Sequence, residues 1–428
     1  MFYSTVCTFL AIYISVFYSH SDGNILYAED TLAEKYGKVI YSSLLFRHGE
    51  RTAANSYPTD PYPLSIWKEG TGQLTKRGKN QAYELGKWFR ERYKNTLLRE
   101  GYRYDLLRAE SSDVDRTLMS GELVLAGAYP PTKEEMWSDD DLIWQPIALH
   151  TVPSSYDNKI GSSAICDRYQ YETQLLNEIS KLQNLYMDQL DVFQYVEDHS
   201  GEYFNSNDIY SAYDSIWNIY DCLFIQNSHN FTLPKWTKKV FPEPLRTVSS
   251  FHFILDVFTT EMKRLRTGPL LNNMIEDMKN KISSPEFNQT IHFYSGHDIT
   301  IAPFLFSLGI YNSIAPPYSA AVIVELREKD YNYFVTILYR NSSQTPPYLL
   351  VPSACGEICT LNKFIEITKP LIPENWQEEC QINFSNRLQN LSTSDILVLL
   401  FAVATTVIAA LVVIRICLER RRKEYNPF

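Results

Sequence analysis

An uncharged run with strong strand propensity that ends abruptly in charged residues constrains this chain more than any other feature. Residues 39–46 (Val-Ile-Tyr-Ser-Ser-Leu-Leu-Phe) lead directly into Arg47-His48-Gly49-Glu50-Arg51. The apolar run predicts a buried strand, because strands covered on both faces of a sheet are hydrophobic throughout. Ligands of open α/β sheets bind beyond the carboxyl ends of the strands, so the charged segment is a candidate site.

The residue types in this segment suit a phosphate group. Arg47 and Arg51 carry guanidinium forks whose paired N–H donors match phosphate oxygens. Between them, His48 supplies an imidazole that can attack phosphorus at neutral or acid pH. Gly49 is expected to let the backbone turn and approach a ligand closely. Taken alone, the segment fits a solvated basic turn equally well.

Composition limits the classes of protein to which the chain can belong. Its 428 residues allow a large core, with one big domain or a domain that carries an insertion. The 30 Tyr, 22 Phe and 7 Trp residues argue against a disordered chain. The formal net charge of −10 argues against nucleic-acid binding, because an acidic surface is repelled by a phosphate backbone.

The two ends of the chain predict targeting and a membrane anchor. Residues 1–20 are apolar and predict a secretory signal peptide, although they lack Lys and Arg; an uncleaved anchor is the alternative. Residues 396–414 are uncharged and, at about 28 Å as a helix, long enough to cross a bilayer core of about 30 Å. Basic residues follow, so we predict a single type I span with a cytosolic tail at 415–428. A buried core helix is the other interpretation of residues 396–414.

Features of the predicted ectodomain fit that topology. Five of the seven cysteines are luminal, an odd number, so at least one is free or pairs between chains. Cys355 and Cys359 have no histidine near them, which favours a small disulfide loop over a zinc site. A sequon at Asn390 is doubtful because it lies so near the membrane. The candidate glycosylation sites are Asn230, Asn288, Asn341 and Asn383.

Predicted strands and helices alternate through residues 21–154, which we interpret as the first part of an α/β core. Residues 74–93 predict a helix with Thr75 as its N-cap. Residues 104–108 predict a second strand, and the helix that follows carries Arg116 on its first turn, where anions are favoured. A surface Arg116 paired with a neighbouring aspartate is the alternative. Residues 142–150 predict a further strand.

The middle of the chain differs in character from both flanks. Residues 155–285 have long polar and aromatic stretches at helical spacing and predict a mainly helical inserted domain. Residues 286–385 return to the core: residues 291–294 predict a strand that ends in Ser295-Gly296-His297-Asp298 before a helix. Residues 320–326 and 333–339 predict two more strands. Residues 386–395 are left as a juxtamembrane stalk.

Two predicted strand ends therefore each carry a histidine, with three arginines nearby and Asp298 beside the second histidine. This arrangement resembles the histidine acid phosphatases, which have an Arg-His-Gly-x-Arg nucleophile loop and a distant His-Asp pair. The resemblance is strongest to prostatic and lysosomal members and covers roughly residues 38–382. The segments that carry it are Tyr57–Pro61, Gly72–Thr75, Glu84–Gly86, Asp113–Ser120, Trp144–Pro146, His150–Pro153, His229–Pro234, Pro316–Tyr318 and Tyr339–Asn341.

The resemblance implies a role for each matching residue. His48 would accept the phosphoryl group as the nucleophile, and Asp298 would protonate the leaving oxygen. Phosphoryl transfer depends mainly on positioning and charge neutralisation, so no metal or other cofactor is expected. A carboxylic acid keeps its proton chiefly at low pH, which predicts an acid optimum. The implied phosphate ligands are Arg47, Arg51, Arg116 and His297.

The resemblance also implies a fold, a set of disulfides and a homodimer. The expected fold is α/β, a mixed-sheet sandwich core like that of phosphoglycerate mutase with a smaller α-helical inserted domain. A long-range disulfide is implied between Cys166 and Cys380, with the short one at Cys355 and Cys359. Cys222 is expected to be unpaired. Ala53 replaces a frequent family proline, which predicts a looser loop with intact chemistry.

The predicted activity is that of an acid phosphatase acting on phosphate monoesters in a secretory or lysosomal compartment. A lysophospholipid phosphatase of the same family and a phosphate-binding membrane glycoprotein without turnover are the alternatives. The tail ends in Tyr425-Asn426-Pro427-Phe428, which resembles a Tyr-x-x-apolar sorting signal and predicts binding of endocytic adaptors. We therefore expect a lysosomal, endosomal or plasma-membrane location with a luminal or extracellular active site.

Overall fold

The computed structural model describes residues 29–139 and 142–382, together with residues 401, 404–405, 408, 411–412 and 414–415. The chain divides into two compact units, residues 1–376 and 377–428, and the fold described below is that of the first unit. Within the described residues, no helix has the length and apolar character needed to cross a bilayer. The predicted signal peptide and stalk, the tail after Arg415, and most of the predicted span lie outside the described residues.

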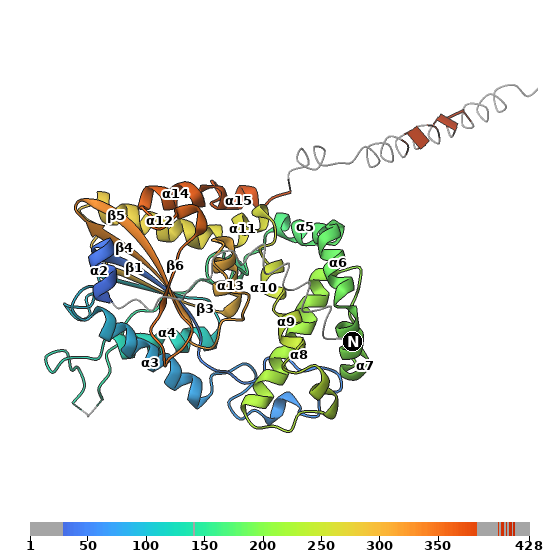
Figure 1. Cartoon of the computed structure of the whole chain (residues 1–428), viewed down its shortest axis with the longest axis horizontal. Helices are drawn as coiled ribbons and strands as arrows, with labels where there is room; N and C mark the ends of the chain where they lie inside the picture. The colour runs from blue at the N-terminus through green and yellow to red at the C-terminus, as the bar shows by residue number, and fades with distance from the viewer. Residues whose placement is uncertain are drawn as a thin grey trace, which may run out of the picture. The chain divides into compact units, whose positions relative to one another are not determined.

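A six-stranded mixed sheet forms the centre of the first unit (Figure 1). The strand order is β2-β3-β1-β4-β5-β6, with β2, β3 and β1 parallel and the other neighbours antiparallel. The strands are β1 (Lys38–Arg47), β2 (Leu107–Ser111), β3 (Ile291–Gly296), β4 (Ala321–Lys329), β5 (Asn332–Arg340) and β6 (Tyr348–Leu350).

The predicted strand at residues 39–46 is confirmed as β1, which is buried along nearly its whole length. It lies third from the edge and pairs with β3 and β4, so it is covered by neighbours on both sides. The two later strands are confirmed as β4 and β5, joined by a two-residue turn at Asp330 and Tyr331. Both turn residues have positive φ, 51° and 62°, as the tight turns of twisted hairpins require.

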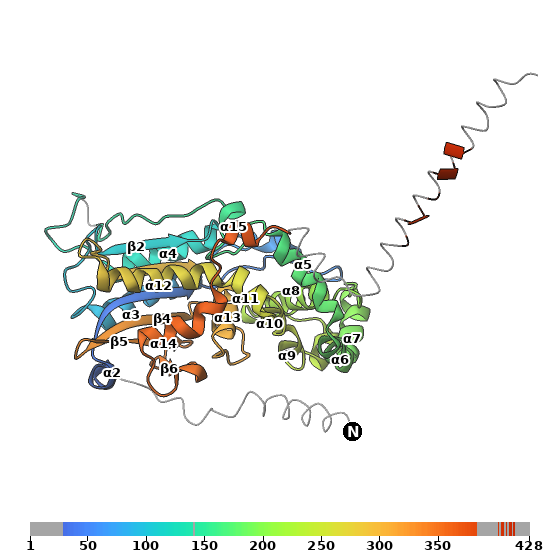
Figure 2. The same ribbon diagram turned by 90° about the horizontal axis from the view of Figure 1, so that it is seen from above.

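Helices cover both faces of the sheet, as Figures 1 and 2 show. One face packs against α2 (Glu29–Tyr36), α3 (Lys76–Tyr93) and α4 (Asp115–Ala128). The other packs against α12 (Gly268–Ser283), α13 (Asp298–Ser307) and α14 (Leu361–Thr368). The predicted α/β class with a mixed sheet between helical layers is confirmed.

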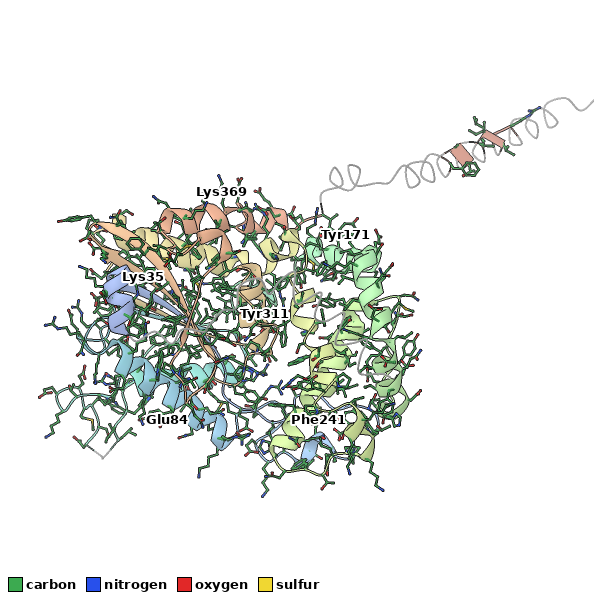
Figure 3. All side chains as sticks on the ribbon, viewed as in Figure 1. Lys35, Glu84, Tyr171, Phe241, Tyr311 and Lys369 are labelled. Carbon is green, nitrogen blue, oxygen red and sulfur yellow. A yellow bond between two sulfur atoms is a disulfide. The ribbon has the colours of Figure 1, made fainter. Side chains whose placement is uncertain are left out.

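A helical module, residues 167–266, lies beyond the end of the sheet where β1 and β3 terminate (Figures 1 and 2). It has its own apolar core, and Tyr311 (labelled in Figure 3) packs against both that core and the sheet core. The prediction extends the helical domain to residue 285, whereas α12 packs on the sheet. The module's helices are α5 (Asp167–Leu175), α6 (Ser180–Asp188), α7 (Leu190–Ser200), α8 (Ile209–Ser228), α9 (Leu245–Ser249), α10 (His252–Leu255) and α11 (Thr260–Arg266).

Local signals in the sequence explain where α3 begins and where one predicted strand fails. Thr75 is confirmed as the N-cap of α3, since its side chain accepts a hydrogen bond from the Gly78 amide. The strand predicted at residues 142–150 is wrong: the described residues there form irregular structure with a single bridge between His150 and Glu110. Apolar side chains that look like a strand in the sequence, among them Ile143, are exposed instead.

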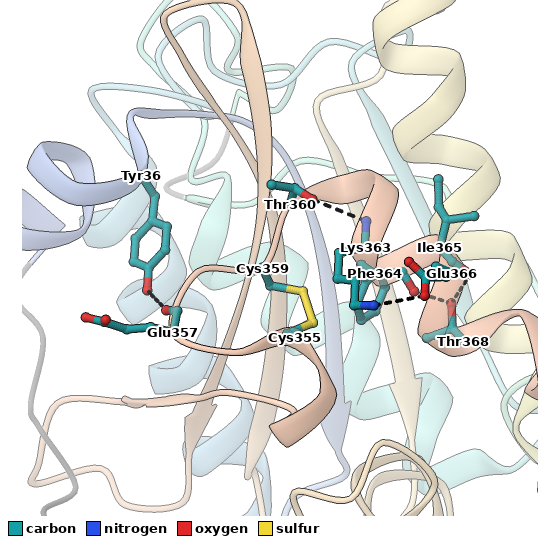
Figure 4. Close-up of a disulfide and its surroundings, with 10 residues drawn as sticks. All are labelled: Tyr36, Cys355, Glu357, Cys359, Thr360, Lys363, Phe364, Ile365, Glu366 and Thr368. Atoms are coloured by element: carbon teal, nitrogen blue, oxygen red, sulfur yellow. Dashed lines mark hydrogen bonds and ion pairs between the residues drawn. A yellow bond between two sulfur atoms is a disulfide. The ribbon is translucent and has the colours of Figure 1, made fainter.

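The cysteines divide into bonded and free groups. Cys355 and Cys359 form a disulfide next to the N-cap of α14 (Figure 4), in line with the prediction. Cys166 and Cys380 are both disulfide-bonded, and their pairing with each other stays a prediction. Cys222 is free and buried in α8, as expected, and burial with the nearby Asp60 carboxylate raises the pKa of its thiol. The short helix α15 (Trp376–Glu379) contains the division between the two units, which falls after Trp376.

Candidate active site

The candidate site lies at the carboxyl ends of the three parallel strands. Arg47 is the last residue of β1 and His48 follows it, and Arg47 is in register with Gly296 at the end of β3. His297 follows as the N-cap of α13, and Asp298 is the first residue of that helix. Arg116 lies in the first turn of α4. Because parallel strands end at the same edge of a sheet, residues more than 240 positions apart in the sequence meet here.

Hydrogen bonds fix which ring nitrogen of His48 carries the proton. Nδ1 lies 2.7 Å from the carbonyl oxygen of Gly49, which can only accept, so Nδ1 is the donor. Nε2 in turn accepts a hydrogen bond from Nε of Arg116 at 3.1 Å. The imidazole is therefore neutral, with the lone pair of Nε2 directed toward a guanidinium group.

The surroundings of His48 keep it neutral under acid conditions. The side chain is buried, and burial lowers its pKa well below the ordinary value. The positive charges of Arg47 and Arg116 lower the pKa further. An ordinary histidine would be protonated at about pH 5, whereas this one keeps a nucleophilic lone pair there.

Arg47 is held in place by three contacts. Its Nη2 lies 2.6 Å from Oδ2 of Asp298, and its Nη1 donates to the carbonyl of Pro316 at 2.6 Å. The ring of Tyr318 stacks on the guanidinium with 4.2 Å between Cζ and the ring centroid. Its Nε is buried without an acceptor among the described residues, so one donor is left for a ligand.

Arg51 contacts a carboxylate that the sequence analysis misses. Its Nη2 donates to Oδ2 of Asp221 at 2.9 Å, and its Nη1 donates to the carbonyl of Thr52 at 3.2 Å. Like that of Arg47, its Nε is buried and has no acceptor among the described residues. Asp221 lies in α8 among buried apolar neighbours, and an acidic residue within the apolar run Ile216–Ile225 is the sequence signal that could have identified it.

Arg116 links the two histidines. Besides its bond to His48, its Nη2 lies 3.4 Å from Nδ1 of His297, whose Nε2 donates to Oγ of Ser112 at 2.8 Å. Burial lowers the pKa of His297 to about 3, with Arg116 the next cause. His297 is thus neutral and orients Arg116. Ser112, which follows β2, is a second contact that the sequence analysis misses.

Charge crowding defines the electrostatics of the site. Burial and, after it, the charge of Arg51 lower the pKa of Arg116 to about 10. Burial opposes ionisation of Asp298, but the charges of Arg47 and Arg51 outweigh it and lower the pKa of that carboxyl. Three guanidinium groups and two carboxylates leave one net positive charge beside a neutral nucleophile. This balance favours binding of an anion.

Gly49 allows the nucleophile loop to pack closely against α3. A Cβ atom built on Gly49 would lie 2.1 Å from the carbonyl oxygen of Gly78, and one on Gly78 would lie 1.9 Å from that of Glu50. Glycine is therefore required here by the close approach of the loop to α3, and its approach to a ligand stays a prediction. The buried Glu50 side chain, bound by both Arg77 and Thr75, fastens the loop to the same helix.

The remaining predicted sites lie outside this cluster. Asn230 and Asn288 are exposed, and Asn341 is half-buried, whereas Asn383, Tyr425 and Phe428 lie outside the described residues. In the described part of the chain, no group of three or more His, Cys, Asp or Glu side chains is arranged to hold a metal ion. The glycosylation, sorting and cofactor predictions stay predictions.

Comparisons with known proteins agree with this arrangement. Residues 38–340 match the family model described as histidine phosphatase superfamily (branch 2). The chain belongs to this family. Prostatic acid phosphatase of Homo sapiens is 35% identical over 356 residues, covering 81% of this histidine phosphatase and 89% of the relative. Lysosomal acid phosphatase of Rattus norvegicus is 33% identical over 350 residues, covering 80% of each chain.

Solved structures add a likeness of fold. Hafnia alvei phytase in complex with tartrate aligns with this histidine phosphatase at a TM-score of 0.59 and 17% identity, covering 81% of this chain and 99% of that one. The predicted resemblance is confirmed by the family match. The prediction of a phosphatase enzyme is confirmed too, because the family is hydrolytic and relatives similar over most of their length are named acid phosphatases.

Proposed function

We propose that this histidine phosphatase hydrolyses phosphate monoesters through a covalent phosphohistidine at His48, with Asp298 as the general acid. The observation that carries the proposal is the neutral His48 imidazole, whose Nε2 lone pair faces guanidinium groups at a strand end. Those groups attract the phosphate, and the lowered pKa of His48 keeps the lone pair available in acid.

The first step transfers the phosphoryl group to the enzyme. Arg47 and Arg51 direct their Nε–H donors, which have no acceptor among the described residues, to the phosphate oxygens, and Arg116 adds a third positive charge. Nε2 of His48 forms the bond to phosphorus while the phosphorus–oxygen bond of the ester breaks. The carboxylic acid of Asp298 gives its proton to the leaving oxygen, so an alcohol departs.

The second step returns the enzyme to its starting state. A water molecule loses a proton to the carboxylate of Asp298 and attacks phosphorus, and the bond from phosphorus to Nε2 of His48 breaks. Inorganic phosphate leaves, Asp298 is protonated and His48 is neutral again. Each residue thus ends the cycle in the form in which it began.

Two other functions of the same site are open to test. A lysophospholipid phosphatase would need room for an acyl chain, and a turnover-deficient phosphate receptor would keep the arginines while lacking an intact nucleophile and acid. His48 and Asp298 are both present and face the arginines, which favours turnover. A panel of aryl, alkyl and lysophospholipid phosphates at acid pH distinguishes the three functions, and absence of hydrolysis across the panel rejects the enzyme.

The charge of Arg116 gives the proposal a pH-dependent test. In Arg116→Gln a positive charge next to His48 is lost, so the pKa of His48 should rise toward its ordinary value. Protonated His48 cannot attack, and the acid limb of kcat/KM is therefore expected to move to higher pH. Profiles of wild type and variant on one aryl phosphate measure the shift, since ionisation of the substrate is common to both. An unmoved limb would show that His48 does not set it.

We further propose that this histidine phosphatase is a type I membrane glycoprotein located in acidic endolysosomes and at the cell surface. A lysosomal acid phosphatase among the relatives is consistent with that location. The uncharged segment 396–414, the four candidate glycosylation sites and the basic tail support the topology.

We also propose a homodimer. Apolar side chains are exposed at Trp137, Leu142, Ile143 and Trp144, and a second copy of the chain would cover the surface that they form. Sedimentation equilibrium of the ectodomain tests this proposal.

The tail gives this location its test. Tyr425 and Phe428 match a Tyr-x-x-apolar adaptor signal, and the predicted span places them in the cytosol. We expect the double variant Tyr425→Ala, Phe428→Ala to accumulate at the cell surface, as measured by surface biotinylation. A matched change of Lys423 and Glu424 to alanine, which leaves Tyr425–Phe428 intact, should have no effect. Delivery of the double variant to acidic compartments at the wild-type rate would reject the signal.

A further inference from the structure

We infer that Asp221, in α8 of the helical module, is a positioning residue that holds Arg51 in the orientation needed to bind phosphate. The inference rests on the proposed function, since Arg51 is a phosphate ligand only in that reaction. The two side chains form an ion pair of 2.9 Å and are both about nine-tenths buried. The pair joins residues 170 positions apart, one in the nucleophile loop and one in the helical module.

The contacts of Arg51 indicate why this carboxylate sets the orientation of the group. A guanidinium is planar, so fixing one edge directs the other. Nη1 binds the carbonyl of Thr52, which is the next residue and moves with the loop. Nη2 binds Asp221, which belongs to a separate helix and therefore fixes the plane relative to the rest of the site. The Nε edge, buried and without an acceptor among the described residues, is then directed to the phosphate.

Charge repulsion makes such a restraint necessary. Arg47, Arg51 and Arg116 all approach one nucleophile, and like charges at this spacing repel. Arg47 has a carboxylate partner in Asp298, but that partner transfers a proton during the proposed cycle. Asp221 takes no part in proton transfer and can hold Arg51 throughout the cycle. The site therefore keeps one phosphate ligand fixed while the other ion pair changes.

A second contact ties the same loop to the same helix. His229, the C-cap residue of α8, places Nε2 at 3.0 Å from Oε1 of Glu50, the neighbour of Arg51. Adjacent residues of the nucleophile loop thus contact α8 at two points, Arg51 through its ion pair with Asp221 and Glu50 through the close approach of His229. The helical module, which contributes no reacting group, sets the position of the loop through these contacts.

The sign of one measurement separates positioning from simple charge balance. If Asp221 only neutralised Arg51, its removal would leave the site more positive, and inorganic phosphate would bind more tightly. If Asp221 positions Arg51, its removal weakens binding despite the added positive charge. We expect Asp221→Ala to raise the Kd of inorganic phosphate in calorimetry and to lower kcat/KM for an aryl phosphate by about a hundredfold.

Graded variants and a matched control sharpen the test. Asp221→Asn keeps an amide oxygen that can accept from Arg51, so its loss should be smaller than that of Asp221→Ala. In an Arg51→Ala background, Asp221→Ala should add no further loss, because nothing is left to position. Asp214→Ala, on the same helix with a half-exposed side chain, should leave both measurements unchanged. Thermal unfolding of each variant verifies that it is folded.

The outcomes are distinct. Phosphate binding by Asp221→Ala that equals or exceeds that of wild type overturns the inference, as does a full additional loss in the Arg51→Ala background. Where Asp221→Ala does not fold, Asp221→Asn and the longer Asp221→Glu, which keeps the charge, are measured by the same criteria. A wild-type chain that hydrolyses no phosphate ester instead rejects the proposed function, whereas normal turnover with unchanged Asp221 variants rejects only the role of Asp221.

Discussion

Replacement of His48 by alanine is expected to reduce turnover of aryl phosphates by about 10⁴-fold or more. Alanine has no atom that can form the bond to phosphorus, while the arginines remain to bind substrate. Phosphate affinity should therefore survive even as kcat falls. This separation of binding from turnover is the behaviour expected of a nucleophile and not of a residue that merely supports the loop.

Rapid quench with phosphorus-labelled substrate measures the intermediate directly. Wild type should yield a phosphorylated enzyme whose label is lost in acid and kept in alkali, as a phosphorus–nitrogen bond requires, and His48→Ala should yield none. His199→Ala is the matched control, because His199 lies exposed in α7, where its ring bonds to the carbonyl of Tyr195 and packs against the rings of Tyr195 and Trp236. Normal turnover in His48→Ala, or label on another residue, would contradict the mechanism.

The reacting residues were accessible from sequence because they sit at places that local patterns specify. An uncharged run that stops at Arg47 indicates both a buried strand and its end, and the glycine turn before His297 does the same for β3. Parallel pairing of these strands is a common consequence of α/β topology. Their ends then meet without any further information, which brings Asp298 to within 2.6 Å of Arg47.

Residues that act through long-range contacts were not accessible in this way. Asp221 lies in no recognised motif and Ser112 lies just outside one, and their partners are 170 and 185 positions away. The strand predicted at 142–150 was wrong for a related reason. The pattern of its apolar side chains is that of a strand, but among the described residues of this segment only His150 pairs with a strand. Whether an apolar segment is buried depends on which other parts of the protein pack against it, and the sequence of the segment alone does not give that information.

The second large effect is expected from Asp298→Asn, and it should depend on the leaving group. An alkyl phosphate releases a strongly basic oxygen that needs a proton, and the variant should slow it by about 10²- to 10⁴-fold. A nitrophenyl phosphate releases a stable anion and should be slowed much less. Asp221→Asn serves as the matched control, since it also removes a carboxylate paired with an arginine but should slow both substrates equally. Equal losses for Asp298→Asn would assign it a binding role.

The pH dependence of the same variant follows from the charges of the site. In the free enzyme the arginines lower the pKa of Asp298, so this carboxyl is ionised over more of the acid range than an ordinary aspartic acid. A bound phosphate dianion takes up the charge of Arg47 and repels the carboxylate, which raises its pKa and favours the protonated acid. Protonation of Asp298 leaves the three arginines and Asp221 with two net positive charges, which balance the two negative charges of the dianion. Hydrolysis of alkyl phosphates by wild type should therefore decline as pH rises and Asp298 loses its proton. For kcat this decline follows the raised pKa of Asp298 in the substrate complex, and for kcat/KM it follows the lower pKa in the free enzyme, so it comes at a higher pH in kcat. The amide introduced by Asp298→Asn does not titrate in this pH range, so the kcat profile of the variant should not decline on the alkaline side. A decline that persists in the variant would mean that another group supplies the proton.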